Sequence, residues 1–349
     1  MICCTIHTLY WLLIFARLSF ADQQKLSPSS SLTSIVVVFK NELENLRVLI
    51  PKLLEQDHPN FEIILCDDHS TDDSYSYAES LDHDLIRLSK ATVDLPGKKS
   101  ALKEAIQLAS GENILLTDAD CYPSSRLWVS SMTSQLVDHK IVLGYSPHLK
   151  APGWLNRFVR FETFMTALQY FTYALSGIPY MGVGRNLLYK RSLFLGSDAI
   201  DKSSHLVSGD DDIFINAESN MDNTNINLNP KSFVYTYPPD SFSTFLRQKR
   251  RHVSTATAYQ WKHKFLLAGF ALSHIMIYVL LITNLLYGSV VTAISVFVVI
   301  MLIKWIIAHR AMKNLQCSDL STYFPILDLL MVLYYIFIAP ATFFKAKNW

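Results

Sequence analysis

The sequence predicts an α/β domain with a mostly parallel sheet, joined to helices that cross a membrane. The 349 residues are 50% hydrophobic and only 17% charged, with a mean hydropathy of +0.20. That composition is too apolar for a soluble domain of this length. From Ser34 onward, short β-branched runs alternate with amphipathic stretches, which is the pattern of parallel strands joined by crossover helices.

The charged residues are spread unevenly along the chain. Residues 1–20 hold one and residues 265–349 hold seven of the 61 Lys, Arg, Asp and Glu side chains, leaving 53 in residues 21–264. This is about 22% of the central segment, close to the roughly 25% of ordinary soluble domains. One soluble domain is therefore expected over residues 31–261, with membrane segments on either side.

Four short aliphatic runs in this domain predict strands over residues 35–39, 61–66, 85–88 and 114–117. Leucines at helical spacing predict a helix over residues 43–54, with Pro51 as a kink. A second helix is expected over residues 99–110, ending at Gly111.

The apolar segments follow and precede this domain. The 39 residues between Lys264 and Lys304 carry no formal charge, and as a helix they would extend about 58 Å, roughly twice the bilayer core. We expect two crossings near residues 265–282 and 289–308. A third stretch over residues 322–344, which completes a C-terminal membrane region of residues 265–344, contains Asp328. It is expected either to cross or to lie as a re-entrant or interfacial segment.

Residues 1–20 are expected to form an uncleaved membrane anchor. The alternative, a cleaved signal peptide, lacks both a basic n-region and a good cleavage site. Basic residues cluster beside the soluble domain, at Arg17 and over residues 247–251. By the positive-inside rule the domain is cytoplasmic, in a multi-pass protein of the cell or inner membrane.

The net charge and the cysteines argue against nucleic-acid binding, a disulfide-stabilised fold and a zinc site. The net charge of +1 provides no general attraction for nucleic acid. The five cysteines fit neither a disulfide framework nor a zinc spacing, and they suit a reducing compartment.

Carboxylates follow two of the predicted strands. Asp67 and Asp68 end the second, and Asp118 and Asp120 follow the fourth. Ligands of open α/β sheets bind at the carboxyl ends of the strands. Aspartates there also form turns and helix caps, but two pairs in this order favour a ligand site.

Five motifs occur in order along the domain: Asp67-Asp68-His69-Ser70-Thr71-Asp72, Gly97-Lys98-Lys99-Ser100-Ala101-Leu102, Asp118-Ala119-Asp120, Gly209-Asp210-Asp211 and Gln248-Lys249-Arg250-Arg251. Together they resemble the signature of family 2 glycosyltransferases with a GT-A fold. The resemblance covers about residues 34–261 and is greatest to membrane-embedded members related to cellulose and hyaluronan synthases and ceramide glucosyltransferase.

The resemblance implies a nucleotide-sugar donor, expected to be a UDP-sugar, and a divalent cation, Mg²⁺ or Mn²⁺, that offsets the charge of the leaving diphosphate. Asp120 matches the direct metal ligand, and Asp118 contacts the metal or the nucleotide. Asp67 and Asp68 match carboxylates that accept hydrogen bonds from the base. Lys98 is expected to contact the base or the phosphates, or else to be a solvated surface lysine.

Asp211 is the candidate general base. The sequence pattern alone does not choose among Asp210, Asp211 and Asp212, and the resemblance selects Asp211. Adjacent carboxylates raise one another's pKa by repulsion, which would keep one basic enough to accept a hydroxyl proton. The same acids would also suit the start of a helix.

Gln248 and Arg251 match a Gln-x-x-Arg-Trp motif in which the arginine neutralises the diphosphate. A basic cluster beside a membrane segment would alternatively bind anionic lipid. His252 replaces the tryptophan, which stacks on the acceptor sugar in polymer-making relatives. This replacement argues against a processive synthase.

Two other segments are candidates for substrate contacts. A loop containing Gly184, Arg185 and Asn186 is expected, with Asp210, to line a sugar pocket, although its glycines would also serve a simple turn. Residues 154–175 form an aromatic helix that would lie in the membrane interface and present a lipid acceptor, or else be buried in the core.

The sequence thus predicts an inverting, metal-dependent transferase that moves a sugar from a nucleotide donor to a membrane-associated or lipid-linked acceptor. One alternative is a processive polysaccharide synthase. Another is a membrane receptor or transporter with a nucleotide-sensing domain, which would leave Asp120, Asp211 and Arg251 without a role.

Overall fold

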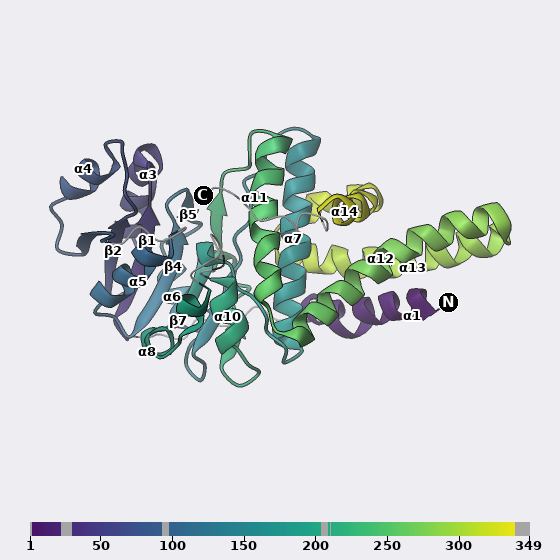
Figure 1. Ribbon diagram of the computed structural model, residues 1–349, viewed down its shortest axis with the longest axis horizontal. Helices are drawn as coiled ribbons and strands as arrows, with labels where there is room; N and C mark the ends of the chain where they lie inside the picture. Colours follow the sequence, from purple (N-terminus) through teal and green to yellow (C-terminus); the bar gives the residue numbers. More distant parts are fainter. Residues whose placement is uncertain (1, 22–29, 93–97, 204–208, 210, 339–349) are drawn as a thin grey trace.

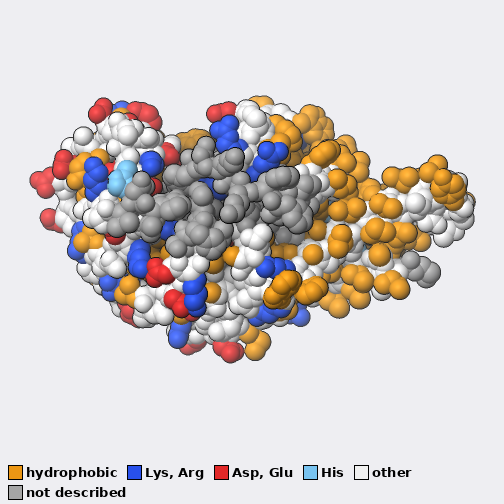
Figure 2. Space-filling view, in the orientation of Figure 1, with side chains coloured by type: hydrophobic (Ala, Val, Ile, Leu, Met, Phe, Trp, Pro, Cys, Tyr) orange, Lys and Arg blue, Asp and Glu red, His pale blue; other side chains and the backbone are white. Residues whose placement is uncertain are grey.

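The computed structural model describes residues 2–21, 30–92, 98–203, 209 and 211–338, and omits the side chains of residues 252–254 and 338. A sheet domain forms one end of the molecule, and long helices extend from the other (Figure 1). Hydrophobic side chains cover the extended end, whereas charged side chains lie over the sheet domain (Figure 2).

The main sheet has seven strands in the order β3-β2-β1-β4-β7-β6-β8. Strands β1 to β4 pair in parallel, β7 is antiparallel to both β4 and β6, and β8 is parallel to β6. The expected mostly parallel α/β fold is therefore confirmed. The strands are β1 Thr33–Phe39, β2 Phe61–Asp67, β3 Ile86–Lys90, β4 Asn113–Asp118, β6 Ile141–Leu143, β7 Leu187–Lys190 and β8 Thr224–Ile226.

A second, two-stranded sheet pairs β5 (Cys121–Pro123) with β9 (Val234–Thr236) in antiparallel fashion. It directly follows the carboxylates at the end of β4. The helices of the domain are α3 Leu43–Leu54, α4 Ser74–Glu79, α5 Lys99–Leu108, α6 Trp128–Thr133, α8 Arg191–Leu195, α9 Ala199–Lys202 and α10 Asp212–Glu218, with 3₁₀ turns η2 Gly184–Asn186 and η3 Pro230–Ser232.

Alternate residues of β1 are buried in two hydrophobic cores on opposite faces of the sheet. Ile35 and Val37 belong to the core that includes Leu46 of α3, whereas Val36 belongs to the core that includes Ile106 of α5. This arrangement follows from the two-residue period of a strand. Helices on both faces make β1 an internal strand in which every residue except the partly buried Val38 is buried, as its continuous aliphatic run predicts.

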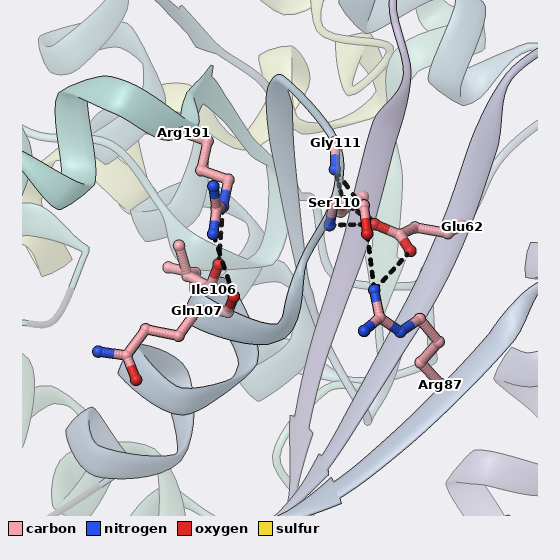
Figure 3. Close-up of polar contacts among 8 residues, drawn as sticks. Glu62, Arg87, Ile106, Gln107, Ser110, Gly111 and Arg191 are labelled. Atoms are coloured by element: carbon pink, nitrogen blue, oxygen red, sulfur yellow. Dashed lines mark hydrogen bonds and ion pairs between the residues drawn. The ribbon is translucent and has the colours of Figure 1, made fainter.

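Polar contacts hold α5 and the loop after it against the sheet (Figure 3). The Glu62 carboxylate accepts hydrogen bonds from the backbone N–H groups of residues 110 and 111 at 2.6 and 3.2 Å. The Arg191 guanidinium donates to the carbonyls of residues 106 and 107 at 2.9 and 3.0 Å, satisfying acceptors that the helix end leaves open. These contacts anchor the C-terminal end of α5 to β2 and to Arg191 at the start of α8.

Four helical segments among the described residues are long and apolar enough to cross a membrane. The first combines α1 (Ile2–Leu9), a π-helical stretch η1 (Tyr10–Phe15) and α2 (Ala16–Ser19). The others are α12 (Trp261–Tyr287), α13 (Val290–Asn314), and η5 (Ser318–Tyr323) with α14 (Phe324–Ile338). The first two expected C-terminal crossings correspond to α12 and α13, which are joined by a turn at residues 288–289. Residues 339–344 of the third expected crossing lie outside the described part.

A buried polar cluster joins these four segments. The Lys304 ammonium of α13 donates to Asp328 Oδ2 of α14 at 2.6 Å, and His274 Nε2 of α12 lies 3.1 Å from the same oxygen. The Tyr278 hydroxyl donates to it at 2.8 Å. The ring of His7 in α1 lies 4.9 Å from that of His274. We call His7, His274, Lys304 and Asp328 the membrane polar cluster; all four are buried.

Helix α7 (Trp154–Leu175) lies between the sheet domain and the membrane helices, beside α11 (Phe242–Ser254), which continues into the 3₁₀ turn η4 (Thr255–Ala258) (Figure 1). It contacts β8 on one side and α2, η1 and α14 on the other. Most of its side chains are buried within the protein. The sheet domain and the membrane helices therefore share this helix as a common wall.

Candidate active site

A cavity of about 1250 Å³ opens at the carboxyl ends of β1, β2 and β4. Its walls come from both halves of the molecule: residues of β1, the loops after β2 and β4, and η2 on one side, and α7, α11, α12 and α14 on the other. The predicted residues that line it are Asp68, Lys98, Asp118, Asp120, Gly184, Arg185, Asp211, Gln248 and Arg251. Carboxylates from distant parts of the sequence thus meet at one edge of the sheet.

Asp118 ends β4 and is paired with Lys98. The Lys98 ammonium donates to Asp118 Oδ1 at 2.6 Å. Burial raises the pKa of the Asp118 carboxyl, but Lys98, Arg185 and Arg251 outweigh it and hold that pKa below its usual range. Asp118 therefore remains ionised, and Lys98 is not a solvated surface lysine.

Asp120 lies beside Asp118 in the turn between β4 and β5. Ligand atoms of Asp118, Asp120 and Cys121 all lie within 4.8 Å of one another, the spacing of a metal site. Burial, followed by the charge of Asp118, raises the pKa of Asp120. Burial also raises the pKa of the Cys121 thiol well above its usual value, so the two carboxylates are the better ligands. Such oxygen ligands fit Mg²⁺ or Mn²⁺.

Asp211 faces the same cavity from the N-terminus of α10. Its Oδ1 accepts a hydrogen bond from the N–H of Asp212 at 2.8 Å, and its Oδ2 accepts one from the N–H of Gly184. Gly184 permits this close approach because a Cβ there would lie 2.9 Å from Asp211 Oδ2. The carboxylate is thus fixed by two backbone donors, as a positioned general base requires.

Asp212 also lines the cavity, but its carboxylate has other partners. Its Oδ2 accepts hydrogen bonds from Thr255 Oγ1 and the Tyr259 hydroxyl, both at 2.6 Å. Burial, followed by the charge of Asp212, raises the pKa of Tyr259 well above its usual value. Asp212 therefore ties α10 to η4 and to Tyr259, whereas the Asp211 carboxylate is held by backbone N–H groups.

Two of the predicted residues are not among those that line the cavity. Asp67 is buried at the end of β2, where its Oδ1 accepts a hydrogen bond from the N–H of Ser70 at 3.1 Å. The Asn186 amide is buried and donates to the carbonyls of Tyr145 and Ser232, both at 2.8 Å. Asp210 and the side chain of His252 lie outside the described residues.

The cavity is also lined by Glu162 and His148, which belong to none of the five motifs, and by Lys249, which lies in the fifth motif but had no predicted role. Lys249 Nζ lies 2.5 Å from Glu162 Oε2, an ion pair that joins α11 to α7. Glu162 is the only carboxylate in α7. A single acidic residue in an otherwise aromatic and apolar helix indicates a specific polar contact, and this feature is visible in the sequence. His148 is buried, with Nδ1 3.1 Å from the Tyr237 carbonyl oxygen. Burial, with the charges of Arg185 and Lys249, lowers its pKa to about 3.

The far end of the cavity is lined by membrane helices. Leu267, Ala268 and Ala271 of α12 contribute, together with Met331 and Tyr334 of α14. The cavity thus extends from the carboxylates at the sheet edge to apolar side chains in the membrane region.

The mostly parallel sheet, extended by β7 and carrying Asp118 and Asp120 at its edge, defines a protein with the GT-A fold. The sequence model described as Glycosyl transferase family group 2 matches residues 135–339, and that of Glycosyl transferase family 2 matches residues 34–194. The chain belongs to the family 2 glycosyltransferases.

Individual proteins match this chain at low sequence identity. Over 119 residues the chain is 29% identical to UDP-Glc:alpha-D-GlcNAc-diphosphoundecaprenol beta-1,3-glucosyltransferase WfaP of Escherichia coli. That alignment covers 33% of this chain and 45% of the relative, so the chain spans less than half of the relative's length.

Solved structures also match. The mannosyltransferase PcManGT from Pyrobaculum calidifontis, in complex with GDP-Man and Mn²⁺, aligns over 95% of this chain and 97% of its own, with a TM-score of 0.58 and 18% identity. At that identity the likeness establishes the fold. Residues 1–349 of S. aureus TarS align over 84% of this chain and 89% of that one, with a TM-score of 0.47 and 17% identity.

Proposed function

We propose that the protein is an inverting glycosyltransferase that moves a sugar from a UDP-sugar to a hydroxyl group of a lipid-linked acceptor. The observation that carries the proposal is the composition of one cavity. It is lined by Asp118, Asp120 and Asp211 at the sheet edge and by apolar side chains of α12 and α14 at the membrane end. A polar donor and a lipid-linked acceptor need those two environments in contact.

In the proposed reaction Asp211 accepts the proton of the acceptor hydroxyl as its oxygen attacks the anomeric carbon. The bond from that carbon to the diphosphate oxygen breaks, and the nucleoside diphosphate leaves. A single displacement inverts the anomeric configuration. Hydrogen bonds from the N–H groups of Gly184 and Asp212 aim the Asp211 carboxylate.

Arg251 and Arg185 line the same cavity and both lower the pKa of Asp118. They supply the positive charge that stabilises the leaving diphosphate, because arginine is well suited to phosphate oxygens. Mg²⁺ or Mn²⁺ held by Asp118 and Asp120 would offset the charge that develops on the diphosphate. Asp68 is the proposed contact to the base.

The similarity to WfaP supports this choice of substrates, because that protein is named for UDP-Glc and a diphosphoundecaprenol acceptor. The basic residues next to the membrane segments support a cytoplasmic active site. A cytoplasmic site would have direct access to sugar nucleotides. The acceptor would reach the cavity from the bilayer.

The proposal is tested on membranes that contain the full-length protein. They are incubated with a panel of radiolabelled sugar nucleotides and Mn²⁺ or Mg²⁺, and label is counted in the extracted lipid. We expect one UDP-sugar to label lipid, with no labelling after chelation of divalent cations. Label in long polymer would instead indicate a processive synthase, and no transfer from any donor would contradict the proposal.

The base assignment is tested by Asp211→Asn, with the exposed Asp222 providing a matched control in Asp222→Asn. Loss of the base is expected to lower the transfer rate by about 10²–10⁴-fold while donor binding is retained. Asp222→Asn should transfer normally. Near-normal turnover in Asp211→Asn would refute the role of Asp211.

A further inference from the structure

A second cavity, of about 570 Å³, lies where the start of α7 meets the turn between α13 and α14. It shares no lining residue with the active-site cavity. Its walls are the segment 150–152, two arginines of α7, and three residues of η5. Because α13 returns to the sheet domain here and α14 departs from it, the cavity lies at the boundary between that domain and the membrane helices.

The cavity is strongly basic. Lys150, Arg157 and Arg160 line it, and Asp319 is the only carboxylate among its lining residues. Asp319 is engaged by the buried Arg160, whose Nη1 and Nη2 donate to its two oxygens at 2.8 and 2.7 Å. Lys150 Nζ lies 3.3 Å from Asp319 Oδ2. Three cations against one carboxylate give the cavity a net charge of +2.

Aromatic rings hold one of these cations in place. The Arg157 guanidinium lies over the rings of Trp154 and Tyr323, at 5.4 and 4.8 Å from their centroids. The Trp154 side chain is itself 51% exposed. Tryptophan and tyrosine beside arginine are typical of the level of lipid headgroups in a bilayer. A ligand at this level would meet charge and aromatic rings together.

An apolar stripe leads away from the cavity along α14. Thr322 lines the cavity, and Ile326, Leu329 and Leu333 follow it at helical spacing with exposed side chains. A molecule with an anionic head and hydrocarbon chains therefore matches both surfaces: the head matches the net charge and the chains match the stripe. A free phosphate ion would use only the first of them.

We propose that this cavity binds the phosphate headgroup of an anionic membrane lipid, at a site separate from the active site. Lys150 and Arg157 contact the phosphate, Arg160 and Asp319 fix the floor of the site, and the acyl chains lie along α14. Such a lipid would bridge α7 to η5 and so connect the sheet domain to the membrane helices.

The test uses delipidated full-length protein in detergent. Phosphatidylglycerol and phosphatidylcholine of the same chain length are added, and bound lipid is counted by native mass spectrometry. The wild type should prefer phosphatidylglycerol. Lys150→Gln combined with Arg157→Gln should weaken its binding by roughly thirtyfold, the usual effect of two basic residues at an anionic surface. Lys313→Gln, an exposed change on α13 outside the cavity, is the matched control and should bind as wild type.

Three results would overturn the proposal. They are equal binding of the two lipids by the wild type, an unchanged preference in the double variant, and equal losses in the double variant and in Lys313→Gln. Displacement of the lipid by millimolar inorganic phosphate, with no dependence on acyl chains, would overturn the choice of a lipid over a free phosphate. Melting temperatures of all variants in detergent verify folding. The single variant Arg157→Lys keeps the positive charge and should retain most of the wild-type binding of phosphatidylglycerol.

Discussion

Replacing Lys304 with Met is expected to destabilise the protein through the membrane polar cluster. Met keeps most of the length of the side chain but removes the ammonium that donates to Asp328 Oδ2 at 2.6 Å. Asp328 is fully buried and would retain His274 and Tyr278 as partners for its charge. Removing one member of a buried ion pair leaves an uncompensated charge, so we expect the free energy of unfolding to fall by about 3–5 kcal/mol.

The pair is measured best by a double-mutant cycle. Asp328→Leu alone should cost a similar amount because it strands the Lys304 ammonium. The double variant carries no charge at either position and should lie closer to wild type than either single change. Unfolding of the purified protein in mixed micelles, followed by far-UV circular dichroism, gives the four free energies. Lys313→Met, an exposed change on the same helix, controls for the loss of a lysine.

Additivity would refute this reasoning. If the two single losses sum to the double loss within about 0.5 kcal/mol, Lys304 and Asp328 act independently. The same conclusion would follow if Lys304→Met were no more costly than Lys313→Met.

Two further predictions concern the active-site cavity. Gly184→Ala places a Cβ 2.9 Å from Asp211 Oδ2, and displacement of that carboxylate should lower kcat by about 10²-fold; donor binding should persist, and an unchanged kcat would contradict the positioning role of Gly184. The pKa of His148 is lowered to about 3, so below pH 6.5 the unfolded chain takes up a proton there that the folded protein does not. Stability should therefore decline as the pH falls from about 6.5 towards 3, and His148→Gln should flatten this slope by up to about 1.4 kcal/mol per pH unit. Chemical unfolding of both proteins at pH 7 and 5 measures the slopes, and equal slopes would mean that His148 is not held neutral.

The parallel half of the sheet was predictable because local sequence determines it. Strands β1, β2 and β4 are continuous aliphatic runs between turn residues, and their observed ends lie within two residues of those expected. Strands β6, β7 and β8 were not predicted. They have only three or four residues each, too few to show a period, and β7 is selected by antiparallel pairing with β4, which ends at Asp118, far earlier in the sequence.

In the candidate site, too, features set by local sequence could be predicted, whereas features set by contacts between distant residues could not. Asp118 and Asp120 could be proposed because strand ends mark a ligand edge, whereas the choice of Asp211 among three adjacent aspartates depended on the family resemblance. Glu162 and Lys249 are 87 positions apart in the sequence, so nothing local indicates that they pair. Asn186 was expected in the sugar pocket, but its amide is used by distant backbone carbonyls.

The wall that α12 and α14 contribute to the active-site cavity has a consequence for water. A fragment of residues 31–260, which lacks all four apolar segments, would keep Asp118, Asp120 and Asp211 but would leave the acceptor end of the cavity open to solvent. Water would then compete with the acceptor for the sugar, and the fragment would be expected to hydrolyse its donor. The membrane helices would in this way protect the cell's supply of activated sugar, in addition to anchoring the enzyme.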